Sequence, residues 1–196
     1  MTPPTRHLDL GCGSRPHNPY RRDELHGVDI ADPRAALPLQ FRQANLALQP
    51  IPYPDDYFDS VSAYDFIEHV PRVLPTADGL GTRFPFVVLM NEIWRVLAPG
   101  GLFYASTPAY PHAAAFQDPT HVNIITIETH KYFTRPETLG RMYGFCGDFE
   151  IRRVVRVRPA AEYEPPSPGA VERFRQRQRE RRGAATHLVW EFAACK

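Results

Sequence analysis

Apolar residues alternate along the chain between runs with strand spacing and runs with helix spacing. The strand-like runs lie at 7–10, 26–30, 42–46, 58–64, 102–106, 149–157 and 187–193. Over 86–98 the apolar residues fall on one helical face, and Pro99-Gly100-Gly101 predicts the end of that helix. A shorter helix is expected over 135–143. This alternation predicts an α/β fold with a mostly parallel sheet, whose last two strands pair as a terminal hairpin.

Two parts of the chain depart from this alternation. Only about a dozen residues separate the first two strands, and Pro16 and Pro19 lie in that gap. Proline disfavours a helix interior, so the first crossover helix is expected to be short or to start late. The stretch 109–134 is rich in histidine, proline and aromatic residues and has too little periodicity to assign.

Length and composition indicate one compact domain. The chain has 196 residues, 43% of them hydrophobic and 23% charged, which suffices for a core without a disulfide framework. Its longest apolar stretch, 84–90, is far shorter than the roughly 20 residues of a membrane-spanning helix. The N-terminus lacks the pattern of a secretory signal, and the three cysteines have no paired spacing. We therefore expect a cytoplasmic protein with reduced thiols and no membrane contact.

Positive charge is concentrated near the C-terminus. Six arginines lie between Val171 and Gly183 beside two glutamates, within an insertion expected over 159–186. A positive helical face there could meet nucleic acid. The alternative is a solvated helix, because the net charge of the chain is only +1 and no aromatic stacking platform accompanies the arginines. The second interpretation is favoured, so nucleic acid is not expected as the main partner.

The strongest local signal is the segment Leu8-Asp9-Leu10-Gly11-Cys12-Gly13, where the first strand ends. Asp29 closes the second strand, 16 residues beyond Gly13. Glycines let a backbone approach a ligand closely, and an acid at the tip of the second strand can accept hydrogen bonds from both hydroxyls of a ribose. Together they predict a nucleoside-binding crevice. For an isolated GxG pattern, a tight turn beside a surface aspartate is the alternative.

Five sequence blocks in a fixed order favour the crevice. They are LDLGCG at 8–13, GVDI at 27–30, ANL at 44–46, FDSVSAYDFIEHV at 58–70 and NEIWRVLAPGGLFYASTP at 91–108. In this order they resemble class I S-adenosylmethionine-dependent methyltransferases of the small-molecule, type 11-like group. The resemblance implies a single domain over 1–196, with a Rossmann-like seven-stranded sheet, an antiparallel last strand and three α/β/α layers.

The resemblance also implies S-adenosyl-L-methionine as the cofactor and assigns residues to it. The implied contacts are Asp9, Gly11, Cys12 and Gly13 with the methionyl part, Asp29 with the ribose, Ile30, Asn45 and Leu46 with the adenine, and Asp65 and Phe66 with the sulfonium. A nicotinamide dehydrogenase is the rival for such a glycine-rich turn. Its fingerprint requires a third glycine where this chain has Pro16, which would obstruct the approach to a pyrophosphate.

The reaction implied is an in-line attack of an oxygen or nitrogen nucleophile on the activated methyl group. Because the leaving group is a neutral thioether, positioning and modest base help suffice. His69 and His121 are the candidate catalytic bases, since imidazole titrates near neutral pH. The candidate substrate-binding residues at the crevice mouth are Glu68, Tyr110, His112 and Asp118. The alternative is that these side chains only orient a helix or open a turn.

The acceptor is expected to be a small polar metabolite, a sugar or a peptide-like molecule. Segment 117–134 resembles a block that many relatives carry after the fifth strand, so 109–134 is expected to be a substrate-side loop. Two rival functions remain open. One is a non-catalytic interaction module, which Pro16 and the short first crossover favour, and the other is an RNA methyltransferase that uses the arginine-rich segment.

No metal site is expected. The candidate ligands His112, Asp118, His121 and His130 have spacings of 6, 3 and 9 residues, which match no helical histidine pairing. A metal-dependent methyltransferase of the catechol type would place acidic ligands at strand ends. Asp65 is one such acid, and a second is not apparent.

Overall fold

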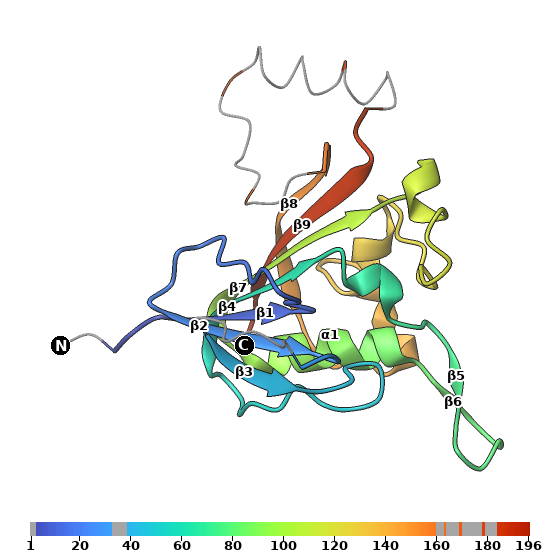
Figure 1. Cartoon of the computed structure of the whole chain (residues 1–196). Helices are drawn as coiled ribbons and strands as arrows, with labels where there is room; N and C mark the ends of the chain where they lie inside the picture. The colour runs from blue at the N-terminus through green and yellow to red at the C-terminus, as the bar shows by residue number, and fades with distance from the viewer. Residues whose placement is uncertain (1–2, 33–38, 160–162, 164–168, 170–177, 179–183) are drawn as a thin grey trace.

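A seven-stranded sheet forms the centre of the molecule (Figure 1). The computed structural model describes residues 3–32, 39–159, 163, 169, 178 and 184–196. The strands of the sheet are β1 (Arg6–Leu10), β2 (Glu24–Asp29), β3 (Gln40–Gln43), β4 (Phe58–Tyr64), β7 (Leu97–Pro108), β8 (Phe149–Val157) and β9 (His187–Ala194). Their spatial order is β3-β2-β1-β4-β7-β9-β8.

The direction of the strands confirms the predicted sheet. Neighbouring strands from β3 to β7 are parallel, whereas β9 runs antiparallel to both β7 and β8. The order reverses beside β1, since β2 lies on one side of it and β4 on the other. In an open parallel sheet, ligands bind outside the carboxyl ends of the strands at such a switch point. The fold therefore places the ends of β1, β2 and β4 where a ligand is expected.

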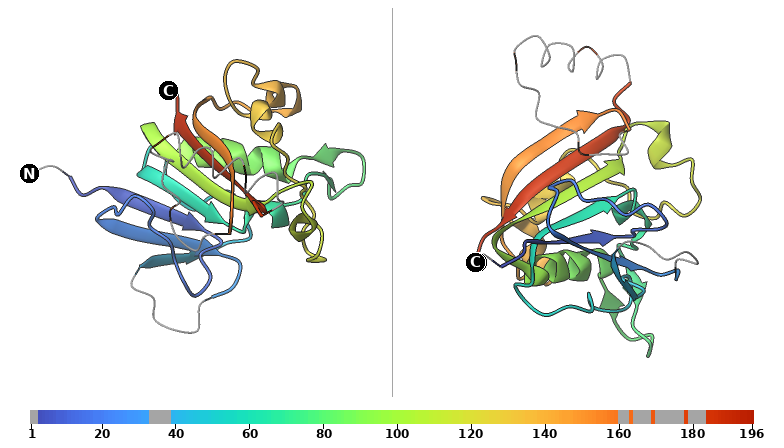
Figure 2. Two further views of the ribbon diagram at one scale, coloured as in Figure 1. Left: turned by 90° about the horizontal axis from the view of Figure 1, so that it is seen from above. Right: turned by 60° about the vertical axis from the view of Figure 1, so that its left-hand side comes forward.

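One face of the sheet is apolar and is covered by helix α1 (Pro85–Val96), as Figure 2 shows. Proline at the first helical position is favourable because its missing N–H has no partner there in any helix. The helix buries one stripe of side chains: Phe86, Leu89, Met90, Ile93 and Val96. They pack with alternate residues of the strands, among them Leu8, Val61 and Phe103, in one hydrophobic core.

The opposite face of the sheet is more polar, and the loop 11–23 packs on it. The His17 ring stacks on Tyr64 of β4, with ring centroids 3.9 Å apart, and Tyr20 donates a hydrogen bond to Glu191 of β9. No helix forms in residues 11–23, so the prediction of a short crossover helix was wrong. Besides the prolines, the Asn18 side chain opposes a helix, because it both accepts from Arg22 N and donates to Arg22 O at 2.9 Å.

Several element boundaries differ from prediction. Helix α1 ends at Val96 rather than at residue 98, because Leu97 is already extended, and β7 continues through Pro99-Gly100-Gly101. The helix expected over 135–143 is the 3-10 helix η4 (Leu139–Tyr143), which ends at Gly144 in a left-handed conformation. The structure also contains a small antiparallel hairpin, β5 (Leu74–Pro75) with β6 (Thr82–Arg83), which projects from the body in Figure 1.

The stretch 109–134, which sequence periodicity left unassigned, contains two further 3-10 helices, η2 (Ala113–Ala115) and η3 (Thr129–Tyr132). The arginine-rich segment lies almost wholly outside the described residues, and so does most of the insertion predicted over 159–186. Within the part of the chain that the structure describes, no helix has both the length and the apolar character needed to span a bilayer.

Candidate functional site

The glycine-rich turn and Asp29 lie in direct contact at the switch point. Gly13 N donates to Asp29 Oδ2 at 2.9 Å, and Gly11 N donates to Val28 O at 2.8 Å. Gly11 and Gly13 have φ angles of +66° and +49°, a region that favours glycine. The turn that leaves β1 and the acid that ends β2 thus face the same space, as the sequence predicted.

Asp9 is buried and anchors this turn. One carboxylate oxygen accepts from His17 N at 2.7 Å, and the other accepts from Ser62 Oγ at 2.6 Å. Because the Ser62 hydroxyl donates its proton to Asp9, it accepts from His7 Nε2 at 2.8 Å, and His7 Nδ1 accepts from Ser60 Oγ at 2.8 Å. The chain of hydrogen bonds from Ser60 to Asp9 fixes the position of the loop that follows Gly13.

The other residues predicted around the crevice differ in accessibility. Ile30 is 63% exposed just after β2, whereas the Leu46 side chain is buried in the core. Asn45 bonds locally, since its side-chain oxygen accepts from Ala47 N at 3.1 Å. Cys12 is buried beside Gly27, and burial raises the pKa of its thiol to about 12, so it remains a packing residue.

The segment after β4 closes over the end of β1. A Cβ on Gly11 would lie 2.5 Å from the Phe66 ring, so only glycine allows this approach. Asp65 has a φ of +44°, and its carboxylate lies 3.0 Å from His187 Nε2 of β9. Phe66 therefore packs against the β1 turn, while Asp65 is held by β9.

Glu68, His69 and His121 converge beyond Phe66. Glu68 and His69 lie in the 3-10 helix η1 (Ile67–His69), while His121 comes from the loop after β7, and its ring centroid is 4.8 Å from that of His69. The backbone explains this convergence: Val122 N and Asn123 N both donate to Glu68 O, at 3.0 and 2.9 Å. The Glu68 side chain is buried, which raises the pKa of its carboxyl group to about 8.

Of the remaining predicted substrate residues, Asp118 adjoins this cluster, since its Oδ2 lies 4.0 Å from His121 Nε2. His112 Nδ1 accepts from Ala114 N at 3.0 Å and caps η2. Asp118 accepts from the backbone and hydroxyl of Thr120, which lowers the pKa of its carboxyl group. The local bonds of His112 and Asp118 match the interpretation in which these side chains orient a helix or open a turn. Tyr110 is half exposed and lies edge-on to Phe116.

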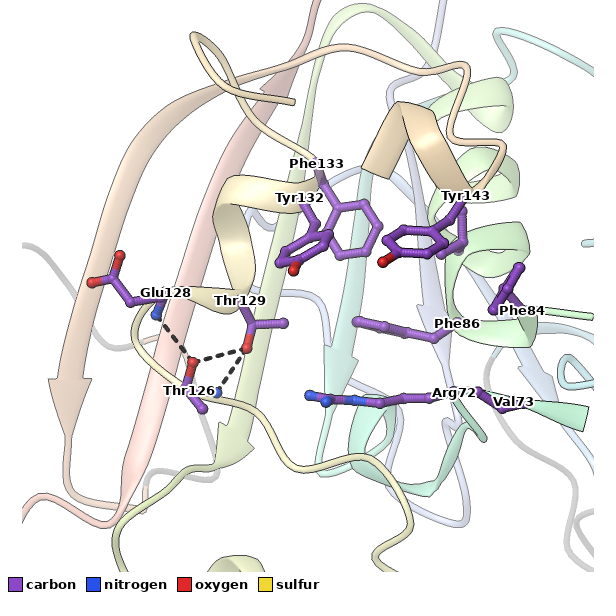
Figure 3. Close-up of a pocket in the computed structure, with 11 residues that line it drawn as sticks. Arg72, Val73, Phe84, Phe86, Thr126, Glu128, Thr129, Tyr132, Phe133 and Tyr143 are labelled. Atoms are coloured by element: carbon purple, nitrogen blue, oxygen red, sulfur yellow. Dashed lines mark hydrogen bonds between the residues drawn. The ribbon is translucent and has the colours of Figure 1, made fainter. Parts of the chain in front are cut away.

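A cavity of about 550 Å³ opens beside this region, and Figure 3 shows the side chains that line it. Among its lining residues are Arg72, Phe84, Phe86, Thr126, Tyr132 and Tyr143. The guanidinium of Arg72 is directed toward the side where Thr126 and Thr129 lie (Figure 3). Arg72 Nε donates to Asn123 Oδ1 at 2.6 Å, so the cavity wall is tied to the loop that carries His121.

No pattern in the sequence pointed to this cavity. The residues that line it come from the loop after η1, the start of α1, η3 and η4. No periodic pattern of apolar residues joins those segments. Thr107 and Thr120 were also missed as partners of the converging side chains. The only available signal was the density of aromatic residues after position 109. Neither Gly11, Asp29 nor Asn45 lines the cavity, so it is distinct from the crevice at the switch point.

Comparison with known proteins identifies the family. A family model described as a methyltransferase domain matches residues 2–144, which is most of the chain. No curated protein matches the sequence closely enough to count as a relative.

Solved structures share the fold at low sequence identity. An S-adenosylmethionine-dependent methyltransferase from Mesorhizobium loti is 15% identical, with a TM-score of 0.54 over 96% of this chain and 90% of that chain. Geranyl diphosphate methyltransferase, solved with GPP and sinefungin, is 15% identical, with a TM-score of 0.54 over 98% of this chain and 73% of the other. The cyclase SpnF is 18% identical, with a TM-score of 0.57 over 97% of this chain and 74% of the cyclase.

The presence of a cyclase among the structural neighbours shows that the fold does not decide the reaction. The family match covers β1 to η4, and these elements include the turn after β1 and the segment after β4. The seven-stranded order with β9 antiparallel agrees with it. The chain therefore belongs to the methyltransferase-domain family and is a class I S-adenosylmethionine-dependent methyltransferase.

Proposed function

We propose that the protein transfers a methyl group from S-adenosylmethionine, bound over the turn at Gly13 and beside Asp29, to an oxygen or nitrogen of a small acceptor. The observation that carries this proposal is the 2.9 Å contact between Gly13 N and Asp29 Oδ2. Both carboxylate oxygens of Asp29 retain lone pairs for ribose hydroxyls. A Cβ on Gly13 would meet nothing within 4 Å, so there is open space over the turn. The exposed Ile30 beside it offers an apolar surface to a flat base.

Asp9 has an indirect part in this proposal. Its carboxylate is 1% exposed and already accepts from the loop and from Ser62, so it acts on the cofactor by positioning the turn. Leu46 can contact the adenine only through its backbone, because its side chain is buried in the core. Cofactor contact by Gly11 and Cys12 is similarly confined to backbone atoms in this proposal.

The acceptor is proposed to react near Glu68, His69 and His121. The cofactor supplies an electrophilic methyl group, while the chain orients the acceptor and helps to remove its proton. His69 Nδ1 is 2.9 Å from Thr120 Oγ1, whose own proton goes to Asp118. His69 therefore donates a hydrogen bond from Nδ1 and keeps the lone pair on Nε2. This lone pair makes His69 a candidate to take the proton of the acceptor.

We infer that the body of the acceptor occupies the aromatic cavity. The rings of Phe86, Tyr132 and Tyr143 favour an apolar or aromatic body, and Arg72 favours an anionic group on it. The hydrogen bond from Arg72 to Asn123 supports a connection between this cavity and the cluster around His121. This inference narrows the expected polar metabolite to a molecule that carries both apolar and anionic parts.

Calorimetric titration of the full chain with S-adenosylmethionine tests the cofactor site. Asp29→Ala removes the ribose acceptor and is expected to weaken binding by at least about tenfold. Asp32→Ala, a nearby exposed aspartate, is the matched control and is expected to bind normally. Absence of binding heat at millimolar cofactor, or equal affinity in Asp29→Ala, would contradict the proposal.

A further inference from the structure

Three potential metal-ligating side chains meet at the acceptor end. Glu68, His69 and His121 each offer one ligand atom, and these atoms lie within 4.8 Å of one another. Ligands about 2.0–2.2 Å from an ion are typically some 3–4 Å apart. A contraction of about an ångström would therefore bring the three atoms to coordinating distance. The expectation of no metal site rested on the spacings of His112, Asp118, His121 and His130, which match no helical histidine pairing. In the structure, the Nδ1 atoms of His112 and His130 bond to local backbone groups.

Two atoms of this cluster are buried without a partner. Among the described residues, neither Glu68 Oε1 nor His121 Nδ1 has a hydrogen-bond partner. The Glu68 residue is 1% exposed and the His121 side chain 9% exposed, so bulk solvent does not reach these two atoms. A buried polar atom without a partner is costly, and a bound ion is one arrangement that would satisfy both atoms.

Surrounding hydrogen bonds orient these side chains for coordination. Thr107 Oγ1 donates to Glu68 Oε2 at 2.9 Å, which leaves Oε1 available. Thr120 Oγ1 donates to Asp118 at 2.6 Å and so accepts from His69 Nδ1, which leaves the lone pair of His69 on Nε2. Metal-binding histidines commonly donate from their second ring nitrogen in this way.

We propose that Glu68, His69 and His121 bind a divalent first-row transition-metal ion. One carboxylate oxygen and two imidazole nitrogens suit such an ion, and a three-ligand set leaves coordination positions open. Asp65 stays outside the set because its carboxylate is held by His187. An acceptor oxygen bound at an open position would lose its proton to water more easily. This last step rests on the proposed function, whereas binding of the ion does not.

Titration of the full-length, chelator-treated protein with Co²⁺ tests the proposal directly. We expect one equivalent to bind, with visible d–d bands and without the near-ultraviolet band of a cobalt–thiolate bond. Glu68→Gln and His121→Ala are each expected to weaken Co²⁺ binding at least about tenfold, as the loss of a ligand predicts. His130→Ala, at a half-buried histidine outside the cluster, is the matched control and is expected to bind Co²⁺ with unchanged affinity.

Three results would overturn the proposal: no binding at millimolar Co²⁺, unchanged binding in both ligand variants, or a thiolate band that places the ion on a cysteine. Circular dichroism of each variant shows whether it is folded, and His69→Gln gives an independent ligand variant if His121→Ala is not. S-adenosylmethionine binding to the metal-free protein separates the two proposals. If the cofactor binds and Co²⁺ does not, the methyl-transfer proposal stands and the metal site is rejected.

Discussion

The two faces of the central sheet are built in different ways. On the face toward α1, residues such as Phe103, Trp190 and Phe192 are fully buried in a continuous apolar core. The opposite face carries buried His7 and Asp9, joined by serine hydroxyls, and a smaller group of tyrosines near Glu191. The first face depends on burial, which has no preferred direction. The second depends on hydrogen bonds, which require particular donors and acceptors.

This difference separates stability from function in the molecule. The polar face, through Asp9, holds the loop that begins at Gly13 and faces Asp29. Directional bonds are suited to this purpose, because they specify the position of a loop that contains no helix. Substitutions on the apolar face should thus lower overall stability, while those on the polar face should act through pH or through single hydrogen bonds.

The largest effect is expected from Phe103→Ala. Phe103 is fully buried between Phe149 and Phe192, with ring centroids 6.4 and 6.1 Å away. Loss of such a ring leaves a cavity and is expected to lower the free energy of unfolding by about 3–5 kcal/mol. Urea denaturation measures the change. Val88→Ala, on the exposed side of α1, is the control, and an equal loss in both variants would contradict the assigned core.

A smaller, pH-dependent effect is expected from His7. Burial and the nearby charge of Arg22 lower the pKa of His7 from 6.5 to about 3 in the folded protein. Below pH 6.5 the unfolded chain binds a proton that the folded protein does not, so stability falls as the pH falls. From pH 6.5 to 5 this costs about 2 kcal/mol, at about 1.36 kcal/mol per pH unit.

His7→Gln isolates this contribution, because all other titrating groups remain in the variant. The free energies of unfolding of the two proteins are compared at pH 6.5 and pH 5, and the wild type should lose about 2 kcal/mol relative to the variant. A constant difference between them at both pH values would show that His7 is not held neutral by the polar face.

Tyr20→Phe tests one hydrogen bond on the polar face. Tyr20 Oη donates to Glu191 Oε1 at 2.8 Å, and Tyr163 Oη also donates to that oxygen at 3.2 Å. Because the carboxylate keeps a donor and the ring is retained, the expected loss of stability is about 1 kcal/mol. Chemical denaturation checks it. A loss of stability as large as that of Phe103→Ala would contradict the proposed difference between the two faces of the sheet.

The smallest effect is expected at a contact that belongs to neither face. Asp148→Asn weakens the ion pair with Arg135, whose side chain is 59% exposed. Solvent and salt screen such a pair, so no measurable shift of the denaturation midpoint is expected. A clear shift that disappears in high salt would show that surface charge contributes more than this comparison assumes.

The sequence by itself was sufficient to predict the strands of the sheet and the meeting of the turn after β1 with Asp29. Strands β4 and β8 have the predicted bounds, because alternation within a few adjacent residues defines a strand. The contact of Gly13 with Asp29 was also predictable, since both follow neighbouring strands at the same edge. The end of α1 was harder to predict from the sequence, because only the structure shows that Leu97 pairs with Phe58 of β4.

The tertiary structure alone decided which side chains meet at the acceptor end. The sequence placed Glu68, His69 and His121 among several candidates at the mouth of the crevice. It did not show which of them touch, because 51 residues separate His69 from its partner Thr120. Their meeting depends on the path of the loop that donates two backbone hydrogen bonds to Glu68 O. Periodicity is a property of neighbouring residues, whereas convergence of distant side chains depends on how the whole chain packs.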